Sequence, residues 1–420
     1  MVKVSLNDLS RESESYQAVT SKDPKQIFNE FLQKKRVFKN KEVLSSSFTP
    51  DKILHRDKEI EAISNLLAPS LILERISNLL IYGFSGTGKS LVTRFVAQNL
   101  ASMAKEKEVN VIPVYINCRL ENNNTEYRLI SNLSAVFGIK TPTSGLSVNA
   151  LYKNLITVID SKSCNIILIL DEIEKLVQNA GDGVLYNLLR INEVLKNTKI
   201  SILGISNNPE FKASLDQRVK SSLSPIEIVF RPYNAIEIAD ILSLRVKDAF
   251  YENIIDDEII NKCAAIAAQE HGDVRRAINL LRVAGELAQQ TGSTKITEDL
   301  LDKASNLLEQ NVTEEIIKSM TKQSKCALYS IISLSKSKNF SKIYSGEVYD
   351  YYLRLADKFG LKRLTFRRLS ELIGELDYNS LIMTRIKNNG RYGRTRELSI
   401  AFPSSLLVRI EQILLSELSQ

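Results

Sequence analysis

The chain has 420 residues, of which 44% are hydrophobic and 25% are charged. This ordinary globular composition excludes a fibrous or wholly disordered protein, and the length leaves room for two or three domains. Four widely spaced cysteines without a CxxC pair, and only two histidines, exclude a disulfide framework and a zinc module. The formal net charge of +7 fits a polyanion such as DNA but does not by itself indicate one.

No apolar run approaches the roughly 20 residues that cross a bilayer, so we expect no membrane partner. The first residues lack the apolar stretch of a signal peptide. We therefore expect a cytoplasmic, nucleoid-associated protein.

Three changes of pattern divide the chain. Residues 1–45 are polar and charged, with one apolar cluster at 27–38, and are predicted to form an N-terminal arm that is loosely held or a peripheral helix. In residues 46–231, apolar runs alternate with helical patterns, which predicts βαβ units and a mostly parallel sheet. The expected strands are 79–82, 111–116, 166–170 and 200–205. Residues 232–310 show only helical spacing and are predicted to form a small helical lid.

The last region, residues 311–420, has a different pattern. Helical stretches are expected at 313–334, 345–358 and 366–376, followed by two strand-like runs around a glycine-rich turn at 388–393. Asn-Gly between strand residues is a strong hairpin signal. Three helices followed by a hairpin are typical of a winged helix.

A phosphate-binding loop is the strongest motif. Residues 83–90 match GxxxxGK[ST], follow an expected strand and precede a helical stretch at 91–100. Its glycines let backbone N–H groups point at phosphate oxygens, Lys89 would reach the β- and γ-phosphates, and Ser90 would bind Mg²⁺. The alternative is a glycine-rich turn that matches by chance. The predicted nucleotide-binding residues here are Gly83, Phe84, Ser85, Gly86, Thr87, Gly88, Lys89 and Ser90.

Two acidic residues follow the expected strand at 166–170. Asp171 would orient the Mg²⁺ shell, and Glu172 would act as general base on the attacking water. An apolar strand followed by Asp-Glu is often only a strand that enters a polar loop, but its order after Lys89 favours a site for ATP or ADP with Mg²⁺. Asn207, after the strand at 200–205, is either a polar contact to the γ-phosphate or a turn former. An arginine in 272–277 either points at the nucleotide or begins a solvated helix.

Together these residues resemble one family, the archaeal initiator proteins related to the eukaryotic origin recognition complex and its cell-division-control partner. The resemblance covers nearly the whole chain after about residue 45. Its marks are His55-Arg56, the phosphate-binding loop, Asn117-Cys118-Arg119, Asp171-Glu172-Ile173-Glu174, Gly204-Ile205-Ser206-Asn207, Leu215-Asp216-Gln217-Arg218-Val219-Lys220-Ser221, Tyr233-Asn234-Ala235 and Gly272-Asp273-Val274-Arg275-Arg276-Ala277. The fold class that it implies is α/β: an AAA+ P-loop parallel-sheet core with a helical lid, followed by an α+β winged-helix domain.

The resemblance also implies roles for single residues. Asn207 is the first sensor, Arg275 the second sensor from the lid, and Arg218 an arginine finger that acts on a neighbouring subunit. Tyr233, at the opening of the lid, joins the nucleotide-binding residues. Gln217 stands where the family usually has proline, and Glu174 stands where it usually has aspartate, which puts the shape of the finger loop in doubt.

DNA contacts are expected from two places. Between 361 and 397 nine basic residues face four acidic ones, and the third helix would bury an apolar face while Arg367, Arg368 and Glu371 turn outward into a major groove. The hairpin tip would meet the backbone or the minor groove. The resemblance adds an inserted helix within 121–155, where Lys140 and Lys153 would meet phosphates. The predicted DNA-binding residues are Arg367, Arg368, Lys387, Asn388, Gly390, Arg391, Tyr392, Arg394 and Lys140.

The function that follows is an ATP-dependent replication initiator with weak ATPase activity. It would bind double-stranded origin DNA, work with paralogous initiator subunits and help to recruit the replicative helicase. Two alternatives stay open: a transcription regulator whose ATPase domain controls a winged helix, and a helicase or clamp loader that acts mainly through protein contacts. A basic helix surface is also often only a solvated face.

Overall fold

The computed structural model describes residues 23, 25, 28–29, 34–45, 48–120, 125–141, 145–338, 343–388, 394–402 and 404–419. The chain divides into two compact units, residues 1–301 and 302–420. Each unit has its own hydrophobic core.

A five-stranded parallel sheet forms the centre of the first unit, in the order β2-β3-β4-β1-β5. Its strands are β1 (Leu79–Tyr82), β2 (Val111–Asn117), β3 (Asn165–Asp171), β4 (Lys199–Ser206) and β5 (Ile226–Val229). The first four lie where the apolar runs predicted them. The fifth was missed because it is a short edge strand, mostly exposed and interrupted by Glu227, so that it has no continuous apolar run.

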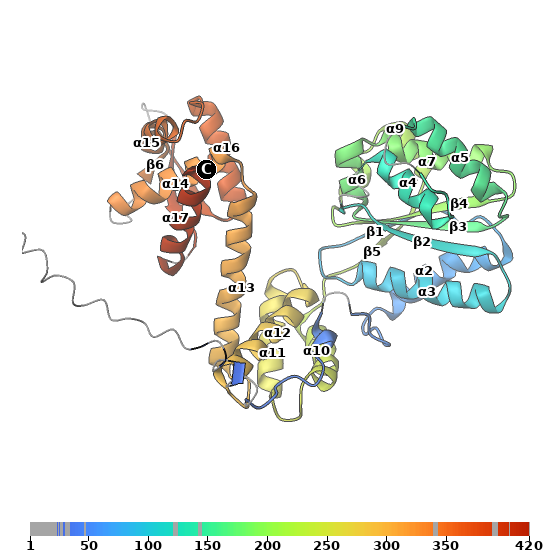
Figure 1. The fold of residues 1–420 in the computed structure, drawn as a ribbon, viewed down its shortest axis with the longest axis horizontal. Helices are drawn as coiled ribbons and strands as arrows, with labels where there is room; N and C mark the ends of the chain where they lie inside the picture. The colour runs from blue at the N-terminus through green and yellow to red at the C-terminus, as the bar shows by residue number, and fades with distance from the viewer. Residues whose placement is uncertain are drawn as a thin grey trace, which may run out of the picture. The chain divides into compact units, whose positions relative to one another are not determined.

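Helices cover both faces of this sheet because each inner strand is buried on both sides. In β3, Ile166, Leu168 and Leu170 enter the core beneath one helical layer, whereas Ile167 and Ile169 enter the core beneath the other. Figure 1 shows these layers on opposite sides of the sheet. The first layer contains α4 (Glu126–Val136), α5 (Val148–Asp160), α6 (Ile173–Ala180), α7 (Gly183–Val194) and α9 (Gln217–Leu223); the second contains α2 (Asp57–Leu67) and α3 (Lys89–Glu106).

The strand register brings the predicted motifs to one edge of the sheet. Tyr82 at the end of β1 pairs with Ser206, and Asp171 at the end of β3 pairs with Asn117 and Ile205. The phosphate-binding loop, the two acids and Asn207 therefore all leave the sheet at its carboxyl edge, which is where parallel sheets bind ligands.

The lid follows β5 and is helical, as predicted. It consists of α10 (Ala235–Ala249), α11 (Asp257–Gln269) and α12 (Val274–Thr291), and α13 (Glu298–Ser319) begins after it. Asn234 and Glu237 form a capping box that starts α10. The minor elements of this unit are two 3₁₀ helices, η1 (Lys41–Leu44) and η2 (Ala68–Ile72), and the one-turn helix α8 (Phe211–Ser214).

The described end of the N-terminal arm is packed, which corrects the expectation of a loosely held segment for residues 37–44. Val37, Val43 and Leu44 are buried. Phe38 bridges to Phe250 at the end of α10, with ring centroids 4.9 Å apart. Residues 1–22 lie outside the described residues.

The second unit has the winged-helix form, which confirms the predicted fold class. A three-stranded antiparallel sheet in the order β6-β8-β7 packs with helices around a core that includes Leu369, Ile373 and Leu376. Its elements are α14 (Lys322–Ser337), β6 (Ile343–Tyr344), α15 (Ser345–Lys358), α16 (Phe366–Tyr378), β7 (Ile382–Asn388), β8 (Arg394–Ile400) and α17 (Ser404–Ser419).

The helix expected at 313–334 is wrong as a single element. α13 ends at Ser319 and α14 begins at Lys322, because the Thr321 side chain accepts the Ser324 N–H and caps a new helix. The sequence reasoning also missed β6 and α17. The predicted boundaries of the arm, core, lid and winged helix, at residues 45, 231 and 310, stay predictions.

Candidate functional site

Lys89 lies at the centre of the candidate nucleotide site, as the first residue of α3. It is 5% exposed, and its ammonium donates hydrogen bonds to the carbonyls of Gly83 and Phe84, at 2.7 Å each, and to Asn207 Oδ1 at 2.8 Å. All three donors of the ammonium are therefore used. These bonds join the loop after β1 to the residue after β4, so the structure brings the two predicted motifs together.

Burial lowers the pKa of Lys89 to about 8, although attraction to Asp171 opposes this shift. Desolvation disfavours the charged form of a lysine, and a bound triphosphate would favour it again. Above pH 8 the nucleotide-free protein would have to take up a proton when it binds ATP.

We therefore expect the affinity for ATP to fall by up to about tenfold per pH unit above pH 8, since one proton is linked to binding. Calorimetry between about pH 7.5 and pH 9.5 measures this, and buffers of different ionisation enthalpy count the proton. The Lys89→Arg variant is the control, because its guanidinium stays charged throughout this range. An equally steep fall in that variant would contradict the assignment to Lys89.

The two predicted acids end β3, and a third acidic residue joins them. Asp171 is 5% exposed, and its Oδ1 accepts the N–H of Glu172 at 3.0 Å. Glu172 has a left-handed backbone (φ 54°), a sparsely populated conformation for a non-glycine residue that is often found at functional sites. Its carboxylate lies 3.9 Å from the guanidinium of Arg119. Glu174 is buried and accepts the N–H of Asn207 at 3.1 Å.

These residues fit a magnesium ion held together with phosphates. Within the described ranges, no group of three or more His, Cys, Asp and Glu residues could hold a metal by itself. Mg²⁺ does not need such a group, since it commonly takes one or two carboxylates, a hydroxyl and phosphate oxygens. Glu174 Oε2 is buried beside this edge without a hydrogen-bond partner. Asp171 and Ser90 are the residues that would hold the ion, and the buried carboxylates supply the negative charge that it requires.

The lid reaches the phosphate-binding loop through residues 271–275. The ring of His271 stacks on Phe84, with centroids 5.2 Å apart. Gly86 has a left-handed backbone (φ 72°), and a Cβ there would overlap the carboxylate of Asp273. That carboxylate accepts the N–H groups of Arg275 and Arg276 and so caps α12. Arg275 itself is exposed and close enough to Lys89 to lower its pKa.

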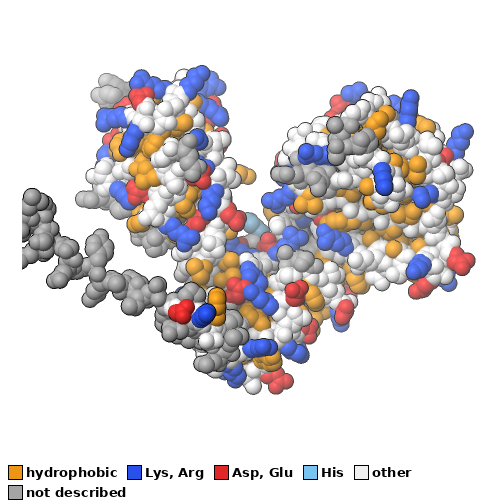
Figure 2. Space-filling view, viewed as in Figure 1, with side chains coloured by type: hydrophobic (Ala, Val, Ile, Leu, Met, Phe, Trp, Pro, Cys, Tyr) orange, Lys and Arg blue, Asp and Glu red, His pale blue; other side chains and the backbone are white. Residues whose placement is uncertain are grey.

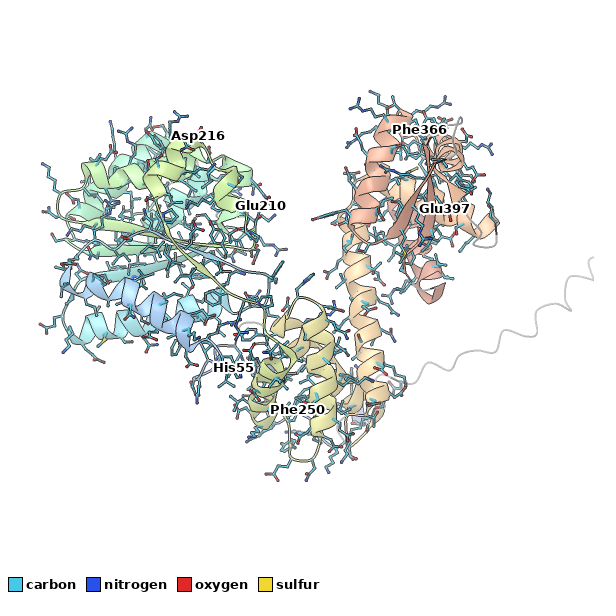
Figure 3. The ribbon with its side chains drawn as sticks, turned by 180° about the vertical axis from the view of Figure 1, so that it is seen from behind. His55, Glu210, Asp216, Phe250, Phe366 and Glu397 are labelled. Carbon is cyan, nitrogen blue, oxygen red and sulfur yellow. The ribbon has the colours of Figure 1, made fainter. Side chains whose placement is uncertain are left out.

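A buried arginine, Arg56, connects the core to the opening of the lid. Its side chain is fully buried and donates to the carbonyls of Thr87 at 3.0 Å and Arg231 at 2.7 Å. Its guanidinium lies 3.7 Å from the centroid of the Tyr233 ring, and the Tyr233 hydroxyl approaches Gly88. The neighbouring His55 meets Asp240 of α10 at 2.9 Å, and Figure 3 labels it between core and lid.

Arg218, the predicted finger, lies on the surface of α9. Its partner, Asp216, is not one of the residues around Lys89. The Arg218 side chain is 78% exposed, and its guanidinium pairs with Asp216 at 3.1 Å. Asp216 lies at the outer rim of the core in Figure 3. The structure therefore does not bring Arg218 to Lys89 with the other predicted catalytic residues.

The candidate DNA helix is α16. Leu369, Leu372, Ile373 and Leu376 form its buried face, as predicted. Arg367 is 92% exposed and Arg368 is 53% exposed, and both pair with Glu371, at 3.6 Å and 2.7 Å. Basic side chains gather at the end of the second unit where α15 and α16 lie (Figure 2).

Two basic residues of the same region have internal partners. Arg363 forms two hydrogen bonds with Asp357, at 2.7 Å and 2.6 Å, and Arg396 donates to the carbonyl of Ser370 at 3.2 Å. The Arg363 pair is as exposed as the pairs of Arg367 and Arg368 with Glu371, whereas the Arg396 guanidinium is held by a backbone carbonyl.

The predicted contacts at the hairpin tip cannot be placed. Gly390, Arg391 and Tyr392 lie outside the described residues, and so do the side chains of Lys387, Asn388 and Arg394, whose backbones belong to β7 and β8. In the inserted segment the described residues form α4 and α5, and Lys140 and Lys153 are both exposed there.

Known families match along most of the chain. The model for an AAA domain matches residues 74–209, that for a Cdc6 AAA+ ATPase-type lid domain matches residues 239–306, and that for the CDC6 C-terminal winged helix domain matches residues 315–409. The ORC1-type DNA replication protein of Thermococcus kodakarensis is 43% identical over 378 residues, which cover 89% of this chain and 90% of that protein. The chain belongs to the ORC1-type DNA replication proteins.

Solved structures agree with this family. The Aeropyrum pernix ORC1 protein in complex with DNA is 36% identical, with a TM-score of 0.79, and the match covers 91% of this chain and 98% of that one. Cdc6p from Pyrobaculum aerophilum, at 22% identity and a TM-score of 0.59, shares the fold. The ORC1-type chain is thus a replication initiator with an AAA+ domain and a winged helix. No helix in the described part of it is long and apolar enough to cross a membrane.

Sequence reasoning missed several residues of the site. Arg56 and Glu174 stood inside motifs that marked the family, but nothing showed that they would be buried against Thr87 and Asn207. His271 and Asp273 precede the predicted Arg275, and only the three-dimensional structure shows that they meet the phosphate-binding loop.

Proposed function

We propose that this ORC1-type chain is a nucleotide-controlled initiator that binds ATP with Mg²⁺ between core and lid and grips origin duplex DNA through its winged helix. The convergence on Lys89 carries the proposal. Groups from three places meet around one buried ammonium: Asn207 after β4, Asp171 and Glu174 at and after the end of β3, and Asp273 with Arg275 from the lid.

Because core and lid both contact this site, a bound triphosphate would be sensed by both. Lys89 would leave the carbonyls of Gly83 and Phe84 for phosphate oxygens, and Arg275 would approach the same charge from α12. Asn207 would stay held by Glu174 through its backbone. The angle between core and lid would then depend on the bound nucleotide, which is the behaviour of a switch.

Turnover is proposed to be slow in an isolated chain. Arg218 points to solvent and pairs with Asp216, so it does not complete the site of its own subunit. An exposed arginine on a helix can instead supply positive charge to the nucleotide of a neighbouring subunit. Paralogous initiator subunits are therefore proposed as partners, with hydrolysis serving to reset the switch.

Direct DNA binding is supported by α16 and by a relative. Arg367 and Arg368 project from the helix, and their ion pairs with Glu371 are exposed. Replacing Glu371 by a phosphate or a guanine edge as the partner of these arginines therefore costs little free energy. The related Aeropyrum pernix ORC1 protein was solved with DNA. Exposed Lys140 is proposed as a phosphate contact of the inserted segment. Recruitment of the replicative helicase is proposed from family membership alone.

Replacing Arg367 and Arg368 together with alanine should weaken binding to duplex DNA by about tenfold or more, because two phosphate or base contacts are lost. The slope of log affinity against log salt should fall by about 0.9 for each phosphate contact that is lost. Fluorescence anisotropy with a labelled duplex at several salt concentrations measures both.

The matched control removes the same charge elsewhere. Lys105 and Lys107 are exposed at the end of α3 in the core, and their double alanine variant should bind DNA as the unaltered chain does. Equal weakening by both double variants would show that only net charge matters, and the assignment of α16 would fail.

A further inference from the structure

Asp171, the acid proposed to hold the Mg²⁺ shell, has a partner on the neighbouring strand. The hydroxyl of Tyr115, on β2, makes a hydrogen bond to Asp171 Oδ2. Arg94, on α3, donates from Nη2 to the same hydroxyl at 2.7 Å, and its guanidinium lies 4.0 Å from the centroid of the Tyr115 ring. A chain of contacts therefore runs from the helix of the phosphate-binding loop to the acid.

The direction of these hydrogen bonds is set by chemistry. A guanidinium can only donate, and an ionised carboxylate can only accept, so the tyrosine hydroxyl accepts from Arg94 and donates to Asp171. The other oxygen of Asp171, Oδ1, accepts the N–H of Glu172 at 3.0 Å. Both carboxylate oxygens are thus held, and the plane of the carboxylate cannot turn without the loss of one of these bonds.

Hydrogen bonds and packing against the core both hold the Tyr115 side chain. Its ring lines a cavity of about 240 Å³ between α3 and β2, together with Arg94, Ala97 and Pro113. Removal of the hydroxyl alone would leave the ring and its contacts unchanged.

We propose that Tyr115, supported by Arg94, is a positioning residue that orients the carboxylate of Asp171 toward the magnesium ion bound with the nucleotide. This inference rests on the proposed function, since it assumes that ATP and Mg²⁺ bind at Lys89 and Asp171. Groups that hydrogen-bond to metal ligands restrict their orientation, and their loss typically costs about tenfold to a hundredfold in metal affinity. Tyr115 itself does not touch the ion.

The test separates metal affinity from nucleotide affinity in the full chain. A fluorescent ATP analogue is titrated first with excess EDTA and then at increasing Mg²⁺, for the unaltered chain and for Tyr115→Phe. We expect both proteins to bind the analogue with the same affinity in EDTA. The Mg²⁺ midpoint is the Mg²⁺ concentration that gives half of the Mg²⁺-dependent increase in affinity, and it should be about tenfold higher in Tyr115→Phe. An Arg94→Met variant, which keeps the tyrosine hydroxyl, should shift this midpoint in the same direction and by less.

Tyr152→Phe is the matched control. Tyr152, on α5, donates to the carboxylate of Glu126 at 3.0 Å and so loses an equivalent hydrogen bond away from the site. This variant should keep the Mg²⁺ midpoint of the unaltered chain even if its melting temperature falls.

Three results would overturn the proposal. If Tyr115→Phe lowers the melting temperature but keeps the Mg²⁺ midpoint, Tyr115 is structural only, and the proposed nucleotide site still stands. If its affinity in EDTA falls as much as its affinity with Mg²⁺, the residue does not act through the ion. If the unaltered chain binds the analogue without any effect of Mg²⁺, the proposed function itself fails and this inference fails with it.

Discussion

Replacing Lys89 with alanine is expected to lower ATP turnover at least about a hundredfold, because the loss of one preorganised charge at a developing phosphate charge typically costs 10²- to 10³-fold. Binding should weaken as well, since the ammonium is the positive group that Asp171, Glu174 and Asp273 surround. Without it these carboxylates would repel the phosphates more strongly. Turnover is measured by phosphate release and affinity by calorimetry.

Lys105→Ala is the control for this substitution. Lys105 lies on the same helix, α3, and is exposed near its far end. The control should retain full turnover. Melting curves of both variants show whether Lys89→Ala remains folded, since its buried ammonium also holds the carbonyls of Gly83 and Phe84. More than a tenth of normal turnover in folded Lys89→Ala would contradict the site.

Replacing Glu172 with glutamine is expected to lower turnover by about 10²- to 10⁴-fold while ATP affinity changes by less than about threefold. The amide keeps the shape of the side chain and does not accept a proton from water. Glu172 is well placed for this role, because it follows Asp171, the acid proposed to hold the Mg²⁺, and its side chain is only partly buried. Single-turnover hydrolysis and equilibrium binding separate the two effects.

Glu210→Gln provides a comparison after the neighbouring strand, where Glu210 is exposed beyond Asn207 (Figure 3). It should hydrolyse ATP normally. If Glu172→Gln loses binding and turnover together, Glu172 holds the nucleotide and is not the general base. The Arg119 contact at 3.9 Å would then be the first place to look for a binding role.

The arrangement of the candidate nucleotide site was predictable because its residues lie in short motifs whose surroundings are local. The phosphate-binding loop needs a strand before it and a helix after it, and β1 and α3 are where the apolar patterns placed them. Asp171 ends the fully buried strand β3, and Glu172 follows it. In a parallel sheet such ends meet at one edge, so Lys89, Asp171 and Asn207 could be brought together from order alone.

The residues that support this site could not be found in the same way. Tyr115 belongs to no motif and is an ordinary aromatic residue of a predicted strand. Its contact with Asp171 depends on the pairing of β2 with β3. Arg56 is bound to Thr87 and Arg231, which are 31 and 175 residues away. The spacing of hydrophobic residues, with a period of two in strands and 3.6 in helices, does not indicate contacts between residues so far apart in the sequence.

The misses in the fold have equally specific causes. β5 is a mostly exposed edge strand, so burial did not mark it. The break between α13 and α14 depends on one capping threonine, Thr321, inside an otherwise continuous helical pattern. The described part of the chain omits residues 389–393 of the hairpin, so the predicted contacts of Gly390, Arg391 and Tyr392 stay predictions.

Competition between duplexes tests whether this ORC1-type chain recognises origin DNA through its winged helix. The full chain is bound to a labelled origin-type duplex at several salt concentrations, and unlabelled origin-type or random duplex is added. We predict that the random duplex competes at least about a thousandfold less well at physiological salt, and that the preference falls in the Arg367→Ala, Arg368→Ala variant. Equal competition by both duplexes, unchanged by the double substitution, would show that the winged helix does not recognise origin DNA.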